Sequence, residues 1–341
     1  MPKRSGVLGR ALSLTAILSV AAVLAACLFT AYWYFSPYQG YTTETFVEIE
    51  HGMSSRQIAR TLQHQGVVRS AWAFMFLRLL NPGAPLQAGE YRFGSEQTPW
   101  QVFQIIRKGE TFYEEITIPE GSNMFDIANL LSAGDTVKPD AFLRAAGDPS
   151  MIKDLDPLAP NLEGYLFPST YRVTHRTTAQ QLCQTMVSEF RKQWAAIGGT
   201  SHDAEIHRIV IVASLVEKET AVPPERPMVA AVYYNRLANG MPLQCDPTTV
   251  YAAELEKRYT GVIHKSDLAS LNPYNTYAHS GLPPGPIANP GVSSLKAALH
   301  PADVPYLYFV AKPDGSGTHQ FSTTLEEHNK AVLAYRNGVS H

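Results

Sequence analysis

With 341 residues, the chain is long enough for two or three domains, each with a sizeable core. Its formal net charge of −2, and the lack of a basic run with interleaved aromatic residues, give no reason to expect nucleic acid as a partner. Tyrosine is plentiful, with 17 residues against 4 tryptophans, a composition that suits sugar and peptide contacts as well as ordinary cores.

The first predicted element is an apolar segment that follows Lys3, Arg4 and Arg10. No charged residue occurs between Arg10 and Glu44, and this apolar run is longer than the roughly 20 residues needed to cross a bilayer. Positive charge precedes the run, and no Lys or Arg follows it until Arg56. This asymmetry predicts one transmembrane helix with a cytoplasmic N-terminus and an exported body.

A cleaved leader is the alternative interpretation of this segment. Residues 24–27 resemble a lipoprotein processing box that ends in Cys27. A signal peptide would have a shorter apolar core followed by polar chain, whereas this run continues to Phe35. The sequence therefore favours an uncleaved anchor. Of the three cysteines, only Cys183 and Cys245 are available to pair in an oxidising compartment, and we expect two free thiols.

Residues 44–112 have the pattern of a small α+β domain. Alternating apolar residues predict strands, and apolar residues three and four apart predict helices. The expected elements are a strand (46–49), a helix after Ser54 or Ser55, a helix (72–80), a strand (88–93) and a helix (100–107). Nothing in this unit has catalytic spacing, so its default role is binding or spacing.

A larger α+β domain is expected from residue 113 onwards. Its opening, ITIPEGSNMFDIANLL, repeats the strand, glycine turn and helix of VEIEHGMSSRQIARTL in the small unit. The further predicted elements are helices 178–197, 209–220, 226–237 and 293–299, strands 306–311 and 319–322, and a last helix from Leu325. Residues 271–291 form a long loop rich in Pro and Gly, and loops of this length are usually functional or disordered.

The helix over residues 209–220 carries the first candidate for catalysis, Glu219, two positions after Glu217. Two positions on a helix point roughly 200° apart, so only one of the two glutamates is expected on the buried face. Three, four and seven positions before Glu219 stand large apolar residues: Val216, Leu215 and Val212. The corresponding set before Glu217 is smaller and more polar: Ser214, Ala213 and Val210. Burial against an apolar wall would favour a protonated Glu219, as a general acid requires.

Position alone does not decide whether Glu219 acts as an acid, acts as a base or takes no part in catalysis. Asp246 is a candidate second carboxylate of a glycosidase pair, although Asp before Pro is also a common start of a turn. If the segment after Gly240 is extended, Gln244, Asp246 and Thr248 share one face. The histidines lack the spacing of a metal site, and no G-x-S-x-G motif indicates a serine nucleophile.

Several long segments resemble the endolytic murein transglycosylases, the YceG-like family: ASLVEKETAVPPERPMVAAVYYNRL, MPLQCDPTTVYA, NPYNTYAHSGLPPGPIANPG, LKAALHPA and PYLYFVA. The resemblance covers nearly the whole chain, including the N-terminal anchor and the segment AGEYRF. It implies that the small unit is similar to a LysM-like peptidoglycan-binding module and that the family's catalytic glutamate falls on Glu219. Cys245 departs from the family pattern, which usually has a small polar residue there.

The resemblance also implies the chemistry. Protonated Glu219 would donate to the glycosidic oxygen between N-acetylmuramic acid and N-acetylglucosamine, and its carboxylate would then take the proton of the muramoyl 6-hydroxyl. That hydroxyl closes on the anomeric carbon, so the product has a 1,6-anhydro end and no second carboxylate acts as nucleophile. Asp246 becomes a substrate-binding or structural residue, and the expected sugar-cleft residues are Gln244, Thr248, Tyr274 and Asn275.

These features predict an α+β protein with a transmembrane helix and its flanks (residues 1–43), a LysM-like module (44–112) and a catalytic domain (113–341). The family implies a single-pass inner-membrane protein whose body is exported to the periplasm. Its substrate would be nascent peptidoglycan glycan strands and its neighbours the peptidoglycan synthases, with no cofactor. The alternative is a membrane-anchored peptidoglycan-binding scaffold with little or no catalysis.

Overall fold

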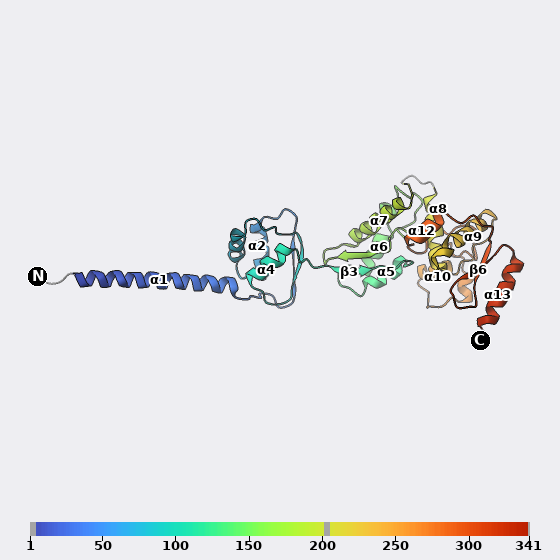
Figure 1. Ribbon diagram of the computed structural model, residues 1–341. Coiled ribbons are helices and arrows are strands. Elements are labelled where there is room, and N and C mark those ends of the chain that lie inside the picture. Colours follow the sequence, from blue (N-terminus) through green and yellow to red (C-terminus); the bar gives the residue numbers. More distant parts are fainter. Residues whose placement is uncertain (1–4, 201–204, 340–341) are drawn as a thin grey trace. The chain divides into compact units, whose positions relative to one another are not determined.

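The computed structural model describes residues 5–200 and 205–339 and divides into two compact units (Figure 1). Unit 1 contains the residues up to Tyr113 and unit 2 those from Glu114 onwards. Each unit has its own hydrophobic core. Lys3 and Arg4, the basic residues expected to precede a membrane helix, lie outside the described residues.

Unit 1 begins with the long helix α1 (Ser5–Phe35), drawn in dark blue in Figure 1. Among the residues that the structure describes, no helix is long and apolar enough to cross a membrane, and the predicted transmembrane helix is not confirmed. The remaining elements follow their predicted order: β1 (Thr45–Ile49), α2 (Ser55–His64), α3 (Ala71–Leu80), β2 (Gly89–Phe93) and α4 (Pro99–Lys108).

A two-stranded antiparallel sheet organises the core of unit 1. Strands β1 and β2 pair so that Val47 lies opposite Tyr91, and both side chains are buried. Alternate residues of a strand point to opposite faces, so one face of the sheet packs on the helices. Helix α4 adds Phe103, which is fully buried and contacts Phe74 of α3 with ring centroids 5.6 Å apart.

Unit 2 is an α+β assembly in which helices outnumber short strands in the part of the chain that is described. Its elements are β3 (Glu114–Thr117), α5 (Met124–Leu131), α6 (Pro139–Ala146), β4 (Thr170–Val173), α7 (Ala179–Ala196), α8 (Ile206–Glu219), α9 (Arg226–Ala238), α10 (Asp246–Leu255), α11 (Lys265–Leu268), α12 (Val292–Leu299), β5 (Tyr308–Ala311), β6 (His319–Ser322) and α13 (Leu325–Val339). Strand β3 pairs with β4 and β5 with β6, both antiparallel. Helix α8 packs against α9, α10 and α12, which places it inside the unit.

The two repeated segments fold alike. Each has a strand, a turn with a glycine in the left-handed region (Gly52, φ 85°, and Gly121, φ 78°) and a helix. A residue with a side chain is strained when its φ is left-handed, which explains why both turns have glycine at this position. Ser54 caps α2 and Asn123 caps α5, each in a reciprocal capping box with a residue three positions later. The repeat predicted from sequence is thus a repeat of local structure.

The segment after Gly240 differs from its prediction. Asp246 is the first residue of α10, and Thr248 lies in the first turn of that helix. The extended conformation that would align Gln244, Asp246 and Thr248 is therefore wrong. Pro247 explains the outcome, because proline is favourable in the first turn of a helix, and Asp-Pro signals a helix start as readily as a turn.

Candidate active site

Helix α8 is enclosed by protein and ends at Glu219. All residues from Ile209 to Val216 are buried, including Val210, Ala213 and Ser214, which precede Glu217. The residues that precede Glu219 and those that precede Glu217 thus do not form one buried and one exposed face of the helix. The prediction that only one of the two glutamates has buried surroundings is wrong. An α-helix that is apolar all round belongs in a core, and the polar end of α8 carries the candidate catalytic residue.

Glu219 is partly buried, and Cys245 and Tyr233 lie beside its carboxyl group. The Cys245 thiol donates a hydrogen bond to Glu219 Oε1 over 3.1 Å. The Tyr233 hydroxyl is buried and makes no hydrogen bond of good geometry with any described residue. Burial raises the pKa of Glu219 above its ordinary value, an effect that the contacts with Cys245 and Tyr233 reduce and the charge of Asp246 reinforces.

Two more groups belong to this neighbourhood. Asp246 is exposed at the start of α10, and its Oδ1 accepts a hydrogen bond from the Tyr277 hydroxyl at 2.6 Å. His319, at the start of β6, is close enough to lower the pKa of Glu219. Its Nδ1 lies 2.7 Å from Glu225 Oε2, and its backbone N–H donates to Glu225 Oε1 over 2.9 Å. Glu225 therefore fixes the position and orientation of His319.

Glu217 has a different role. Arg226 Nη2 donates to Glu217 Oε1 over 2.9 Å, and both side chains are almost fully buried, with 5% of Glu217 and 8% of Arg226 exposed. The backbone N–H of Gly291 donates to Glu217 Oε2, also over 2.9 Å. Glu217 thus joins the end of α8 to the start of α9 and to the long loop, and it is not a solvated carboxylate.

The remaining predicted site residues separate into two groups. Thr248 and Asn275 are fully buried, and both side chains are bonded within the protein. Thr248 Oγ1 donates to the Cys245 carbonyl over 2.6 Å, while the Asn275 amide donates to three carbonyls of the 267–270 segment. Tyr274 is almost buried, with its ring against Tyr251. Only Gln244 and Asp246 of the predicted substrate residues have exposed side chains.

Gln244 has an uncommon backbone conformation. Its φ of 50° lies in the left-handed region, which a non-glycine residue enters at an energetic cost. Its N–H donates to the Thr276 carbonyl over 3.2 Å, and the next residue, Cys245, donates its own N–H to Thr276 Oγ1 over 3.0 Å. These bonds from the long loop hold Cys245 in place next to Glu219.

A second acidic residue, Glu163, is completely buried. Its Oε2 accepts hydrogen bonds from the Met124 N–H (2.9 Å) and the Tyr251 hydroxyl (3.1 Å), and its Oε1 accepts from the Asn289 amide (2.8 Å). Burial raises the pKa of Glu163 to about 8. Asn289 Oδ1 in turn accepts from the N–H groups of Gly164 and Leu166. Together, Glu163 and Asn289 connect the 161–171 segment, α5, α10 and the long loop.

Sequence reasoning missed Cys245, Tyr233, Glu163 and Asn289. Glu163 is the only charged residue of the aromatic, turn-rich segment 161–171, and this composition is the one signal in the sequence that could have indicated it. The contact between Cys245 and Glu219 joins residues 26 positions apart, and no periodicity predicts such a pair. Among the described residues, no group of three or more His, Cys, Asp or Glu side chains could hold a metal ion.

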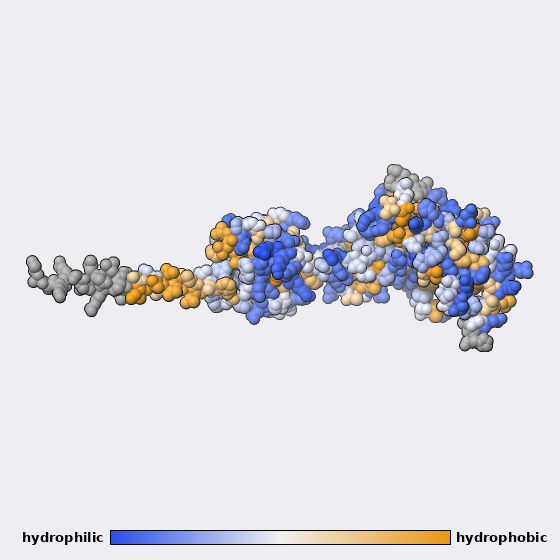
Figure 2. Space-filling view, viewed as in Figure 1, coloured by the Kyte–Doolittle hydropathy of each residue, from blue (hydrophilic) through white to orange (hydrophobic). Residues whose placement is uncertain are grey.

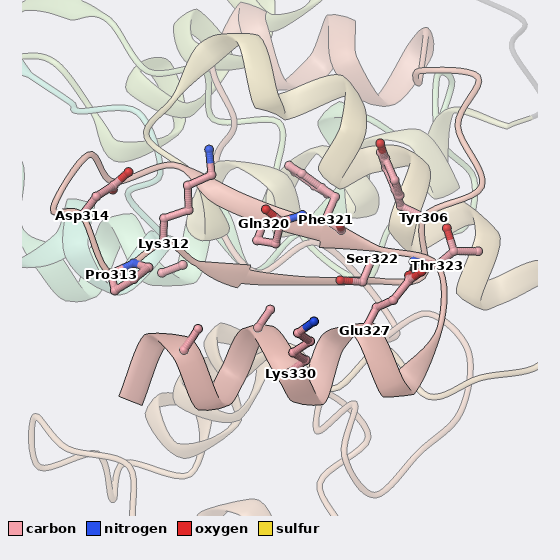
Figure 3. Close-up of a pocket in the computed structure, with 13 residues that line it drawn as sticks. Tyr306, Lys312, Pro313, Asp314, Gln320, Phe321, Ser322, Thr323, Glu327 and Lys330 are labelled. Atoms are coloured by element: carbon pink, nitrogen blue, oxygen red, sulfur yellow. Dashed lines mark hydrogen bonds between the residues drawn. The ribbon is translucent and has the colours of Figure 1, made fainter. Parts of the chain in front are cut away.

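Two hollows of unit 2 lie away from Glu219. One of about 720 Å³ lies between the β5–β6 hairpin and α13, where Figure 3 shows Lys312, Gln320 and Lys330 around it. Another of about 770 Å³ lies between β4 and α7 and is lined by hydroxyl and charged side chains. Neither is lined by Glu219, Cys245 or Asp246, so the candidate site at the end of α8 is separate from both hollows.

Comparison with known proteins gives consistent matches over most of the chain. The model of the YceG-like family matches residues 47–334. A Bacillus subtilis (strain 168) protein named endolytic murein transglycosylase is 34% identical over 311 residues, which are 86% of this chain and 85% of that protein. A protein of the same name from Streptococcus pneumoniae (serotype 2, strain D39) is 28% identical over 323 residues, and the match spans 58% of its length. A crystal structure of a YceG-like protein from Listeria monocytogenes, 34% identical, has a TM-score of 0.53 and covers 85% of this chain and 99% of its own.

Proposed function

This chain belongs to the YceG-like family, and we propose that it is an endolytic murein transglycosylase in which Glu219 serves as both acid and base. The family model spans most of the chain, and the match with the Bacillus subtilis protein covers 86% of this chain. Because these relatives are named as enzymes, a peptidoglycan-binding scaffold with little or no catalysis is not favoured.

The proposed reaction needs one carboxyl group that first gives a proton and then takes one. Glu219 donates its proton to the oxygen between N-acetylmuramic acid and N-acetylglucosamine as the bond to the anomeric carbon breaks. The muramoyl 6-hydroxyl oxygen then bonds to that carbon and passes its proton to the Glu219 carboxylate. Glu219 ends protonated, the product has a 1,6-anhydro end, and no water is consumed. Asp246, held by Tyr277, serves as a substrate contact.

One observation carries the proposal: Glu219 lies at the end of a buried helix, is itself only partly buried, and has a carboxyl whose pKa is raised by burial. A general acid that works near neutral pH must keep its proton there while remaining in reach of the substrate. Glu217 fails this requirement because Arg226 and Gly291 occupy its oxygens. Glu163 fails it because its side chain is fully enclosed.

The test is a product analysis with purified protein and isolated glycan strands in H₂¹⁸O. We expect fragments with anhydro ends that contain no ¹⁸O, detected by mass spectrometry. Glu219→Gln should abolish them, because Gln keeps the shape of the side chain and cannot give a proton. Hydrolysis would produce reducing ends that contain ¹⁸O, and such products from the wild type would contradict the proposal.

Asp246→Asn is the matched control. It removes a nearby carboxylate and keeps the side chain in a position to accept from Tyr277. The variant should still form anhydro ends, at a reduced rate, because Asp246 transfers no proton in the proposed reaction. A loss as complete as that in Glu219→Gln would assign the chemistry to both carboxylates.

We further propose that the protein is held at the inner membrane by its N-terminal segment, with the body in the periplasm and near the peptidoglycan synthases. The support is the charge-free run between Arg10 and Glu44 and the basic residues before it. We also propose that residues 44–112 form a LysM-like module that binds glycan strands. Its support is the resemblance of the sequence to the family.

A further inference from the structure

Helix α3 of unit 1 is apolar on every side. Nine of its ten residues, AWAFMFLRLL, are apolar, and Arg78 is the exception. The inward face, with Ala73, Phe74 and Leu77, is buried in the core of the unit. A helix of this composition is expected to be covered all round, so its outward face calls for an occupant.

The outward face of α3 is exposed in the chain. Trp72 is 82% exposed, Leu79 72%, Leu80 61% and Phe76 41%. Their spacing of four, seven and eight positions from Trp72 places them on one side of the helix. Figure 2 shows hydrophobic side chains gathered in a patch on the surface of this unit. Contiguous exposed apolar patches mark interaction sites for proteins or membranes.

The apolar face continues onto α1. The rings of Tyr34 and Phe76 contact each other with centroids 5.0 Å apart. A hollow of about 390 Å³ lies between the two helices, and Phe29 and Trp72 are among the residues that line it. Helix α1 also has exposed apolar side chains of its own, such as Leu28 (70%). An occupant of the α3 face therefore meets a second apolar helix beside it.

The segment that carries this face has charge of one sign. No Asp or Glu occurs between Glu50 and Glu90, a stretch that contains both α2 and α3. The same stretch contains four arginines: Arg56, Arg60, Arg69 and Arg78. An apolar helix face with Trp and Leu, in a segment that is basic and has no acidic residue, fits the surface of an anionic bilayer.

The other occupants fit less well. A sugar that stacks on Trp72 needs polar side chains around the ring for its hydroxyl groups, and the neighbours on this face are Phe76, Leu79 and Leu80. We propose that the outer face of α3 docks onto the surface of an anionic lipid bilayer. This inference is independent of the chemistry at Glu219 and of whether α1 crosses the membrane.

The experiment measures how strongly lipids quench Trp72. The full chain with Trp33→Phe is reconstituted into vesicles of phosphatidylcholine and phosphatidylglycerol, with and without bromine on the acyl chains. This chain keeps Trp72, Trp100 and Trp194, the last of which is only 2% exposed. Adding Trp72→Phe should lower the bromine-dependent quenching about threefold, because Trp72 then no longer contributes from the lipid interface.

Trp100→Phe is the matched control, because Trp100 is 40% exposed in the same unit but belongs to α4. It should leave most of the quenching in place. Equal losses in the two variants would overturn the inference. So would an absence of Trp72 quenching on these protein-free vesicles, which would assign the face to a protein partner. Quenching should weaken when phosphatidylglycerol is omitted.

Discussion

Glu219 has one thiol donor, and this contact leads to a prediction about pH dependence. The Cys245 hydrogen bond favours the ionised carboxylate and so lowers the pKa of Glu219. The proposed reaction begins with protonated Glu219, so kcat/KM should fall as pH rises through its pKa. Cys245→Ala removes the donor and should move this alkaline limb to higher pH. The measurement is a pH profile of kcat/KM for anhydro product formation.

Two further variants separate this effect from a loss of packing. Cys245→Ser keeps a donor at the same position and should return the limb toward that of the wild type. Cys183→Ala also removes a buried thiol, but from α7 and not from the segment beside Glu219, and should leave the limb unchanged. A limb that moves to lower pH in Cys245→Ala would show that the thiol does not stabilise the carboxylate.

Glu163 leads to a prediction about stability. Its pKa is raised from the ordinary value of 4.5 to about 8 in the folded protein. Between these values the folded chain holds a proton that the unfolded chain has released. The free energy of unfolding should therefore fall as pH rises through this range, by about 1.4 kcal/mol per pH unit from this group at most. The contribution is fully present below the unfolded pKa and is lost above the folded one.

Glu163→Gln tests this point, because the amide does not titrate. Urea unfolding of unit 2 at several pH values from 5 to about 8.5 should give a shallower pH slope for the variant than for the wild type. The variant should be less stable than the wild type at the acidic end, where the wild-type group is fully satisfied. Parallel slopes for the two proteins would mean that Glu163 titrates at its ordinary pKa.

At the scale of elements, the Glu217–Arg226 pair joins α8 to α9. Both side chains are almost fully buried, and Gly291 N–H adds a bond from the long loop. Removing one partner leaves the other charge buried and alone, so Glu217→Ala should destabilise unit 2 by about 3–5 kcal/mol in urea unfolding. The double variant Glu217→Leu with Arg226→Met should recover much of this loss. Additive losses in the double variant would contradict a direct coupling.

The periodic elements were predictable because their signals are local. Alternation and three-to-four spacing predicted β1 and α7 close to their observed limits, and the first residues of α2 and α13. The prediction was wrong where one signal has two structural outcomes, as at Asp246–Pro247, which begins a helix. It was also wrong for α8, whose two faces are both buried, because periodicity describes a half-buried helix and not a central one.

The candidate site was predictable only at its carboxylate. Glu219 could be chosen from its position after an apolar run and from the family resemblance, and its assignment stays a prediction. Cys245 and Tyr233 lie beside Glu219 because α8 packs against α9 and α10. This packing depends on contacts between residues that are far apart in the sequence. Thr248 and Asn275 are residue types that are common in sugar-binding sites. In this protein they are buried, and their side chains form hydrogen bonds with other groups of the protein.

At the scale of the whole molecule, catalysis and anchoring are proposed for different segments. Each unit has its own core, and the candidate site lies entirely in unit 2, so residues 44–341 should cleave soluble glycan strands without the N-terminal segment. The full chain should stay with membranes after an alkaline carbonate wash, whereas residues 44–341 should be released.

The two readouts distinguish an anchor from a structural segment. If residues 1–43 only hold the protein at a bilayer, their removal changes where the protein sits and leaves the anhydro product spectrum on soluble strands as it was. A truncated chain that makes no product, while the full chain does, would mean that the segment is needed for the fold or the site. A full chain released by carbonate would contradict the proposed anchor, because a hydrophobic segment inserted in lipid resists such extraction.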